Sequence, residues 1–466
     1  MAAPLSVLPS ALPASPDAAS ALARLRAFRA ALHACCSNRA DALLDLADAL
    51  LSAQGPVASL PHLSLEPAHR RGWGSLYAAL ARGRIDAERL RDLLAGHPLA
   101  GGQPVYAVDV TTWPRCDAEC SPERGLYYHP SRHSAGQPIV AGWAFQWICQ
   151  LGFARDSWTA PVDAARLHPL DDTDQHAARQ IRALLGRLGA GGPVPWFVFD
   201  AGYDSAQLSL DLAEAPVVVL VRLRSDRCFY PDPPPRPPGA GGRPRRHGAK
   251  FAFADPTTWP APTTTHVATD DQYGTVTVQA WAGLHPKQHR HPGHGSGTPR
   301  PIVRGTVIRV QVERIPARTR PPKVLWLWWA GPAGCALDPE LAWRAYTRRF
   351  DLEIVCTQVT KPRLGAAWGG RDHVADLHPA VGDHDPVDQQ LHQLAALLEA
   401  GLAQTYPQLL QHLGRGPGDA ADLDHVNGHG FVPGGGQRVA PLAAMRSPRW
   451  WPGGVPVRGH QSSPLA

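Results

Sequence analysis

Lysine, cysteine and long apolar runs are scarce in this chain of 466 residues. Lysine occurs at only four positions, so arginine carries almost all the basic charge, and its planar guanidinium can bind two phosphate oxygens at once. No uninterrupted apolar run approaches about 18 residues, which argues against a membrane-spanning helix. The apolar, proline-broken segment 1–17 lacks a basic stretch before it, so we expect no signal peptide.

The eight cysteines are scattered rather than arranged as a disulfide framework. The close sets are Cys35-Cys36 and Cys116-x-x-x-Cys120, and no second pair lies at zinc-finger spacing. We therefore predict a reduced, cytoplasmic protein without a structural zinc ion. Its length suits two or three domains with a substantial core. The net charge of +6 suits a polyanionic partner but does not require one.

Residues 1–100 predict an N-terminal helical region, because leucines recur at helical spacing from about residue 20. A basic cluster, His69-Arg70-Arg71, lies between short helices and next to Trp73. Such a cluster can contact a DNA backbone. A solvated turn beside a packed tryptophan explains the same residues equally well.

Two apolar runs each carry a carboxylate. The run 104–110 contains Asp109, and the run 195–199 ends on Asp200. Both patterns predict buried strands, and ligands bind at strand ends in open α/β sheets. Either acid alone is equally explained by a local structural role, such as capping a helix. Together they favour a site where two carboxylates share divalent metal ions.

Residues 101–224 predict the order strand, meander, helix, strand, helix, strand. This order is expected for a ribonuclease-H-like fold, an α/β fold with a mixed sheet flanked by helices. We therefore assign 101–224 to the first part of such a core. In this fold the first strand supplies one acid, a later strand the second, and a helix beyond the last strand the third.

Residues 225–322 predict a β-rich insertion, with β-like runs at 274–278 and 307–312. A Pro/Gly-rich stretch at 231–242 leads into a basic loop. The basic residues of this loop are Arg243, Arg245, Arg246 and Lys250. Such patches are usually solvated loops, but the position before the expected catalytic helix favours phosphate contact.

Residues 323–362 predict the last core strand, at 324–329, followed by the catalytic helix. On that helix Tyr346, Arg349 and Glu353 are three and four residues apart, so they share one face. A surface Arg–Glu pair would give the same spacing.

Asp109, Asp200 and the motif Tyr346-x-x-Arg349-x-x-x-Glu353 resemble the acidic triad of DDE transposases from bacterial insertion sequences. The similarity is to the branch whose third acid lies in a Tyr/Arg/Glu/Lys signature behind a β-rich insertion. It spans roughly residues 20 to 353. Further runs that resemble this branch are 121–124, 157–163, 199–204 and 245–248.

The resemblance implies a DNA transposase that cleaves and transfers DNA strands. Asp109, Asp200 and Glu353 would hold two Mg²⁺ ions, or Mn²⁺ in their place. Tyr346 and Arg349 would contact the scissile-strand phosphate, and Lys361 would do so only if the local helix differs from the pattern. The implied partner is double-stranded DNA, both element ends and target, which a homodimer would suit. No membrane partner is expected.

The chain departs from the transposase pattern just after Glu353. Where the family carries a lysine on a continuing helix, position 360 is Thr, Lys361 comes one place late, and Pro362 ends any helix. Residues 363–466 predict an atypical, largely disordered tail with one helical stretch at 389–413. We interpret this as a changed coding frame or a joined sequence; a divergent but genuine C-terminal region is the alternative.

Three functions therefore stay open. The first is an active DDE transposase. The second is a ribonuclease-H-like nuclease that uses the same acids but never joins strands. The third is a catalytically impaired remnant that only binds DNA, which the interruption at Pro362 favours.

Overall fold

The computed structural model describes ten segments of the chain. They are residues 16–52, 60–72, 74–99, 102–114, 124–128, 139–153, 159–239, 241–287, 301–315 and 324–352. All of them belong to one compact unit, Met1–Ala420. Glu353, Lys361 and the predicted tail lie outside the described residues. Within the described part, no helix combines the length and hydropathy that crossing a bilayer requires.

The N-terminal part is helical, as the leucine spacing predicts. Its elements are α1 (Pro16–Cys35), β1 (Cys36–Asn38), α2 (Ala40–Ser52), α3 (Leu60–Leu63), α4 (Gly74–Arg82), β2 (Arg84–Ile85) and α5 (Ala87–Ala95). Leu32, Leu76 and Leu90 are fully buried and belong to one apolar cluster of this part. The amphipathic spacing of these leucines thus produces a small helical core of its own.

The central sheet has the strand order of a ribonuclease-H-like fold. Its first strands are β3 (Val105–Pro114), β4 (Gly125–Tyr128), β5 (Ile139–Leu151), β6 (Thr159–Leu167), β7 (Trp196–Phe199) and β8 (Val218–Leu223). β3, β5 and β6 form an antiparallel meander, whereas β7 is parallel to β3 and β8 is parallel to β7. The spatial order β6-β5-β3-β7-β8 therefore places the first strand, β3, at the centre.

Helices connect the parallel strands, as parallel pairing requires. α6 (Thr173–Leu188) lies between β6 and β7 in the chain, and α7 (Ser205–Asp211) lies between β7 and β8. Asp172 and Asp204 cap these helices by accepting hydrogen bonds from backbone N–H groups of the first turn.

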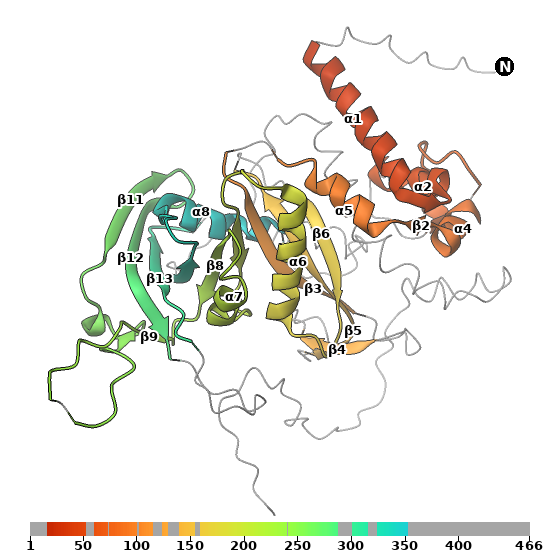
Figure 1. Ribbon diagram of the computed structural model, residues 1–466. Coiled ribbons are helices and arrows are strands. Elements are labelled where there is room, and N and C mark those ends of the chain that lie inside the picture. The colour runs from red at the N-terminus through yellow and green to blue at the C-terminus, as the bar shows by residue number, and fades with distance from the viewer. Residues whose placement is uncertain are drawn as a thin grey trace, which may run out of the picture. The chain divides into compact units, whose positions relative to one another are not determined.

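The strands of residues 225–322 extend the same sheet instead of forming a separate one (Figure 1). They are β9 (Cys228–Tyr230), β10 (Phe251–Ala252), β11 (Thr264–Asp270), β12 (Gly274–Pro286) and β13 (Gly305–Val312), and β14 (Leu325–Ala330) follows. β14 pairs antiparallel with β8, β13 with β14, β12 with β13, and β11 with β12. The result is a sheet of 12 strands among the described residues.

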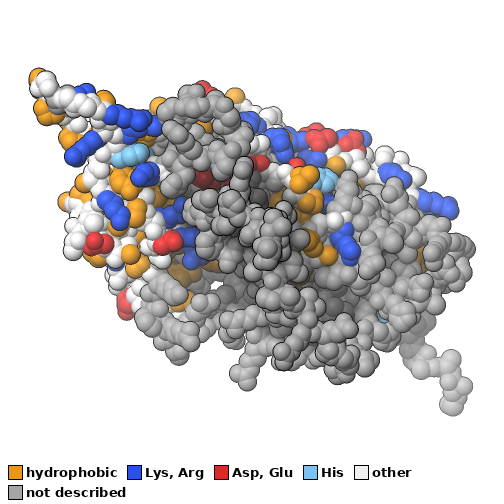
Figure 2. Space-filling model, turned by 90° about the horizontal axis from the view of Figure 1, so that it is seen from below, with side chains coloured by type: hydrophobic (Ala, Val, Ile, Leu, Met, Phe, Trp, Pro, Cys, Tyr) orange, Lys and Arg blue, Asp and Glu red, His pale blue; other side chains and the backbone are white. Residues whose placement is uncertain are grey.

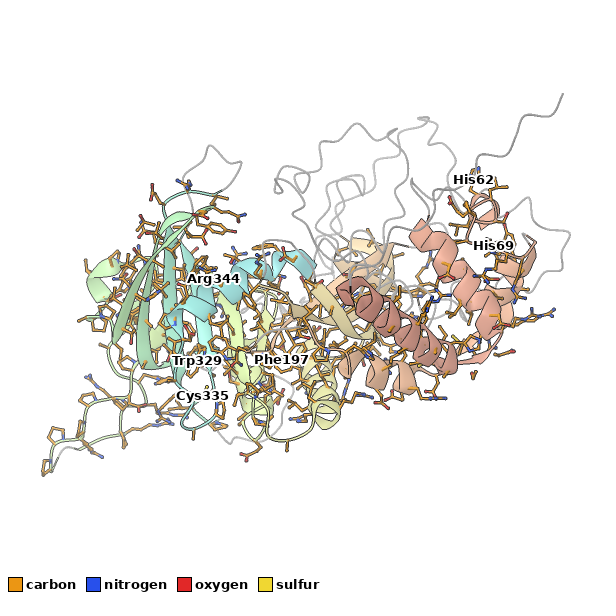
Figure 3. The ribbon with its side chains drawn as sticks, turned by 90° about the horizontal axis from the view of Figure 1, so that it is seen from above. His62, His69, Phe197, Trp329, Cys335 and Arg344 are labelled. Atoms are coloured by element: carbon orange, nitrogen blue, oxygen red, sulfur yellow. The ribbon has the colours of Figure 1, made fainter. Side chains whose placement is uncertain are left out.

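The last described helix, α8 (Pro339–Arg348), begins at an N-cap, Asp338, with a proline in its first turn. Trp343 and Tyr346 are buried in the apolar cluster on one face of the sheet, while α6 and α7 contribute to the cluster on the other. Figure 3 shows Phe197 and Trp329 within the packed sheet region and Arg344 on α8. The sheet is therefore covered on both faces, and its alternating side chains divide between two cores.

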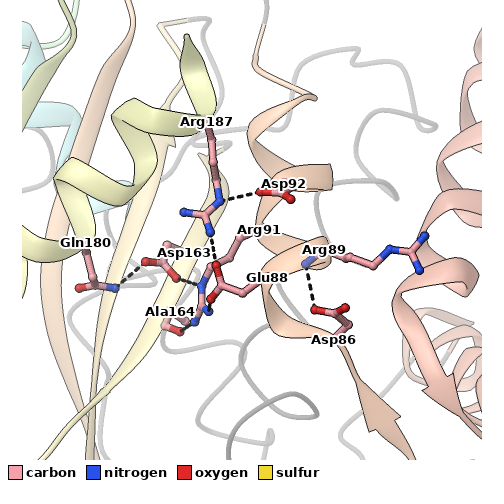
Figure 4. A network of polar contacts seen from close by, with 9 residues as sticks. All are labelled: Asp86, Glu88, Arg89, Arg91, Asp92, Asp163, Ala164, Gln180 and Arg187. Carbon is pink, nitrogen blue, oxygen red and sulfur yellow. Dashed lines mark hydrogen bonds and ion pairs between the residues drawn. The ribbon is translucent and has the colours of Figure 1, made fainter.

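A polar network ties α5 to the sheet (Figure 4). Arg91 Nε donates to Asp163 Oδ1 at 2.5 Å, and Gln180 Nε2 donates to the other oxygen of Asp163 at 2.9 Å. Arg187 of α6 also pairs with Asp92 and Glu88. Because Arg91 and Asp163 are largely buried, this ion pair positions α5 against β6.

Candidate active site

Asp109 and Asp200 lie side by side at the carboxyl end of the parallel pair β3–β7. The register pairs Val108 with Phe199, and each acid is the next residue of its chain. Side chains alternate between the faces of a sheet. Val198 belongs to the apolar cluster on the α8 face, so Asp200, two residues later, faces α8, as does Asp109 two residues after Ala107.

Arg349 makes a direct ion pair with Asp109. Its Nη1 lies 2.6 Å from Asp109 Oδ2, and the Arg349 side chain is only 4% exposed. Asp109 Oδ1 accepts the backbone N–H of Val110 at 2.8 Å. Arg349 and the Val110 N–H thus fix the orientation of the Asp109 carboxylate, whose oxygens are of the kind that Mg²⁺ prefers.

Asp200 is held by the turn that follows it. Its Oδ1 accepts the backbone N–H of Gly202 at 2.8 Å. A Cβ at position 202 would lie only 2.9 Å from that oxygen, so the turn favours glycine here. The helix cap belongs to Asp204, which accepts from the N–H groups of Ala206 and Gln207. Asp200 therefore does not cap α7, and its carboxylate remains at the strand end.

Tyr346 and Arg349 come together at the end of α8. The regular helix ends at Arg348, and the Arg349 guanidinium lies 5.7 Å from the centre of the Tyr346 ring. Burial raises the pKa of Tyr346, and the nearby Arg349 and Arg222 oppose that rise. The expected third acid, Glu353, and Lys361 lie beyond the described residues.

Tyr203 is a site residue that the sequence reasoning missed. Its side chain is buried, and its hydroxyl has no hydrogen-bond partner in the described structure. Burial holds the pKa of Tyr203 well above its ordinary value, and the charges of Asp109, Asp200 and Asp174 raise it further. The ring lies 5.0 Å from that of Phe199, the residue before Asp200, in the apolar cluster on the α6–α7 face. Its place in the run Asp-Ala-Gly-Tyr-Asp was the available signal, but sequence alone does not say that the ring turns inward.

Arg222 is a second missed residue. β7 pairs with β8 through Phe199 and Val221, so Arg222 occupies the same row as Asp200 on the next strand. Its side chain is exposed, on the face that holds α8. Alternation within the strand Val218–Leu223 was the signal that could have placed it beside the acids.

The donor chemistry of this site fits Mg²⁺ but is incomplete in the described residues. Carboxylate oxygens are the ligands that Mg²⁺ prefers. Asp109 and Asp200 supply two, and within the described segments no group of three His, Cys, Asp or Glu side chains could hold a metal ion. The third ligand expected from the sequence, Glu353, is the residue directly after the last described one.

The predicted basic residues lie in the loop between β9 and β10, and not around the carboxylate pair. All four side chains, Arg243, Arg245, Arg246 and Lys250, are exposed. Figure 2 shows this loop projecting at the upper left, with Lys and Arg side chains along it. Next to them, the His247 ring lies 5.3 Å from Tyr230 and 5.0 Å from His285, which packs the loop against the sheet.

Two residues of the N-terminal basic cluster His69-Arg70-Arg71 make contacts within the helical region. Arg71 Nε lies 2.8 Å from Asp45 Oδ2 of α2, and His69 is buried. Of the three residues, Arg70 is exposed and carries no such ion pair in the described structure. Both interpretations of the cluster stay open, because Arg70 and Arg71 are exposed and Trp73 lies outside the described residues.

The fold and the paired acids together define the ribonuclease-H-like class. A family model described as "DDE superfamily endonuclease" matches residues 31–287, more than half of the chain, and the chain belongs to this family. The match includes Asp109 and Asp200 and ends before α8.

A solved structure of the piggyBac transposase, in a synaptic complex with hairpin DNA, is similar at 10% sequence identity. The similarity covers 85% of this chain and 78% of the other, with a TM-score of 0.33. No curated protein matches the sequence. The family assignment therefore comes from the family model.

Proposed function

We propose that this chain is the DNA transposase of an insertion sequence, which cleaves DNA at the element ends and joins them to a target. The observation that supports this most is the row formed by Asp109 and Asp200, directly after the last pair of β3 with β7, in a chain of the DDE superfamily endonuclease family. Two carboxylates on neighbouring parallel strands would be suited to holding the divalent metal ions that assist phosphoryl transfer.

In this proposal Asp109 and Asp200 hold the metal, and Glu353 completes the set. When bound, two Mg²⁺ ions would activate the attacking water or 3′-hydroxyl and stabilise the leaving oxygen. The protein itself orients the two carboxylates. The Gly202 N–H orients the Asp200 carboxylate, and Arg349 fixes the orientation of Asp109.

Arg349 would also contact the scissile-strand phosphate. A guanidinium carries five N–H donors, and its planar fork can bind two phosphate oxygens at once. The Tyr346 ring next to Arg349 restricts the positions that the guanidinium can adopt. Arg222, in the row of Asp200, is placed to add a second positive charge beside the same phosphate.

Asp109→Asn and Asp200→Asn test the proposal. Each variant is incubated with a labelled duplex that carries the element ends, with Mg²⁺ or with a chelator. We expect cleavage to need Mg²⁺ and to fall more than about 100-fold in each variant, because a displaced ligand alone can cost that much. Asp271→Asn, an exposed turn residue, is the control and should cleave normally.

The products separate the alternatives. Joined target strands support a transposase. Cleavage without joining would indicate a nuclease that uses the same acids but does not transfer strands. DNA binding without cleavage, in the unsubstituted chain, would favour the impaired remnant. Full activity in Asp109→Asn would contradict the assigned site.

A further inference from the structure

Arg309, on β13, forms no ion pair with a carboxylate of the described residues. Its Nη1 donates to Gln279 Oε1 and its Nη2 to Gln311 Oε1, both at 2.9 Å. The guanidinium lies 5.4 Å from the centre of the Trp259 ring. Its Nε is buried without a hydrogen-bond partner in the described structure. Neutral amides and an aromatic ring therefore orient this cation without neutralising it.

The contrast with Arg304 shows how unusual this environment is. Arg304 Nε lies 2.9 Å and 3.1 Å from the two carboxylate oxygens of Asp232, and this pairing raises its pKa. Burial alone lowers the pKa of Arg309. A part-buried cation without a counter-charge costs free energy. An anionic ligand at Arg309 would recover part of that cost.

Arg309 lies where one face of the sheet changes from a buried aromatic cluster to exposed side chains, because its partner on β14, Trp326, is buried whereas Thr265 on β11 is exposed. Directly paired residues share a face, so the register places Thr265, Gln279 and Arg309 in one row of that face. Val267, Thr277 and Gln311 form the next such row, and the Val267 side chain is 60% exposed. On the opposite face the alternating residues Val276, Val278 and Val310 are buried.

We propose that this face, which we call the Arg309 face, binds the phosphate backbone of double-stranded DNA. Its residues are Thr265, Val267, Thr277, Gln279, Arg309 and Gln311. Hydroxyl and amide side chains beside an arginine are typical of DNA backbone contacts. Thr265 and Val267 on this face are exposed, and polar side chains in two adjacent rows suit an extended duplex better than a small anion. Glu313, the acidic side chain further along this strand face, is engaged by the N–H of Thr275.

The register also locates the Arg309 face relative to the acids. Arg222 lies in the row of Asp200, and that row continues through Leu327 to Ile308. Arg309 is one residue further, three strand spacings or about 14 Å from β7, and on the opposite face of the sheet. The phosphates bound at this face are therefore different from the scissile phosphate at Asp109 and Asp200. The Arg309 face should contribute affinity, and not the rate of the chemical step.

The inference rests on the proposed function, because it requires that the chain bind DNA.

The first test compares Arg309→Met with Arg304→Met, which removes a charge already neutralised by Asp232. Binding of a fluorescein-labelled linear duplex is followed by anisotropy over a range of salt. We expect Arg309→Met to bind about tenfold more weakly, as for a lost hydrogen bond to a charged group. Its salt slope should be smaller by about 0.9. Arg304→Met should bind normally.

A second pair of variants does not depend on the packing of Arg309. Thr264 and Thr265 are adjacent, exposed and on opposite faces of β11. Thr265→Glu adds a negative charge to the Arg309 face and should weaken binding, whereas Thr264→Glu should not. Equal effects of the two variants, or unchanged binding in Arg309→Met with a normal melting temperature, would overturn the inference. Failure of the unsubstituted chain to bind DNA would instead overturn the proposed function.

Discussion

Arg349 Nη1 lies 2.6 Å from Asp109 Oδ2, although 240 positions separate the two residues in the chain. The contact joins the end of α8 to the first strand of the sheet. The Arg349 side chain is almost completely buried, and that of Asp109 is 21% exposed. One ion pair thus connects the segment that carries the third motif with the strand that carries the first acid.

Arg349→Met should destabilise the fold strongly. Removing one partner of a buried ion pair leaves the other charge uncompensated, at a cost of about 3 kcal/mol. Arg344→Met is the matched control, because Arg344 lies on the same helix and pairs with Glu340 at the surface. We expect it to cost less than about 1 kcal/mol. Urea denaturation measures the unfolding free energy of both variants. Equal losses would show that the Arg349–Asp109 ion pair contributes no more to stability than a surface pair.

Tyr203→Phe should raise the unfolding free energy, by about 1 kcal/mol. Within the described part of the chain the buried hydroxyl has no hydrogen-bond partner, and such a group costs roughly 1–3 kcal/mol. Thermal unfolding with both proteins at neutral pH checks this. A destabilised Tyr203→Phe would mean that the hydroxyl has a partner, and a slower cleavage rate with unchanged stability would give it a role at the site.

Replacement of all four basic loop residues with alanine should weaken DNA binding and flatten its dependence on salt. These residues are Arg243, Arg245, Arg246 and Lys250. Each lost phosphate contact reduces the slope by about 0.9. Arg187→Ala is the control, because Arg187 is already paired with Asp92 and Glu88. An unchanged slope in the fourfold variant would mean that the loop is only solvated.

Mild acid should destabilise the protein through His176. Burial lowers the pKa of this imidazole below its ordinary value of 6.5, and Arg179 lowers it further, against the opposing charge of Asp171. Between the folded and unfolded pKa values the unfolded state binds more protons, so stability is complete above about pH 6.5 and falls below it. His176→Gln should show a weaker decline in urea titrations over this range. An identical decline would assign the effect to other groups.

The sequence as given should cleave DNA more slowly than a version with the coding frame restored past Glu353. Pro362 costs about 3 kcal/mol within a helix, and the run after Glu353 is β-branched. A Mg²⁺-dependent cleavage assay on the two proteins measures the difference. Equal rates would show that the present C-terminal region supports the site.

The strands were the most predictable part of the structure. Short apolar runs bounded by turn residues identified β3 and β7, and helical periodicity identified α6, because local patterns determine local structure. The order of the elements then predicted the ribonuclease-H-like sheet, which the structure confirms. The insertion was predicted to be β-rich, but its pairing with β14 depends on contacts distant in sequence.

The candidate site was predictable only in part. The two acids stood out because each interrupts an apolar strand. The bond between Arg349 and Asp109 could not be found, because helical spacing suggested only a shared face with Tyr346 and Glu353. The ion pair between Arg71 and Asp45 was equally hidden in the sequence, because 26 positions separate the two residues.

The continuity of the sheet has a consequence for truncation. β13 covers the outer edge of β14 along the pairs from Thr306–Trp329 to Val310–Leu325. Excision of residues 225–322 would leave that edge with unpaired N–H and C=O groups beside Trp326 and Trp328. Such an edge is a template for pairing with other chains. The insertion therefore cannot be removed as a separable module, and a shortened chain should aggregate rather than yield a smaller soluble core.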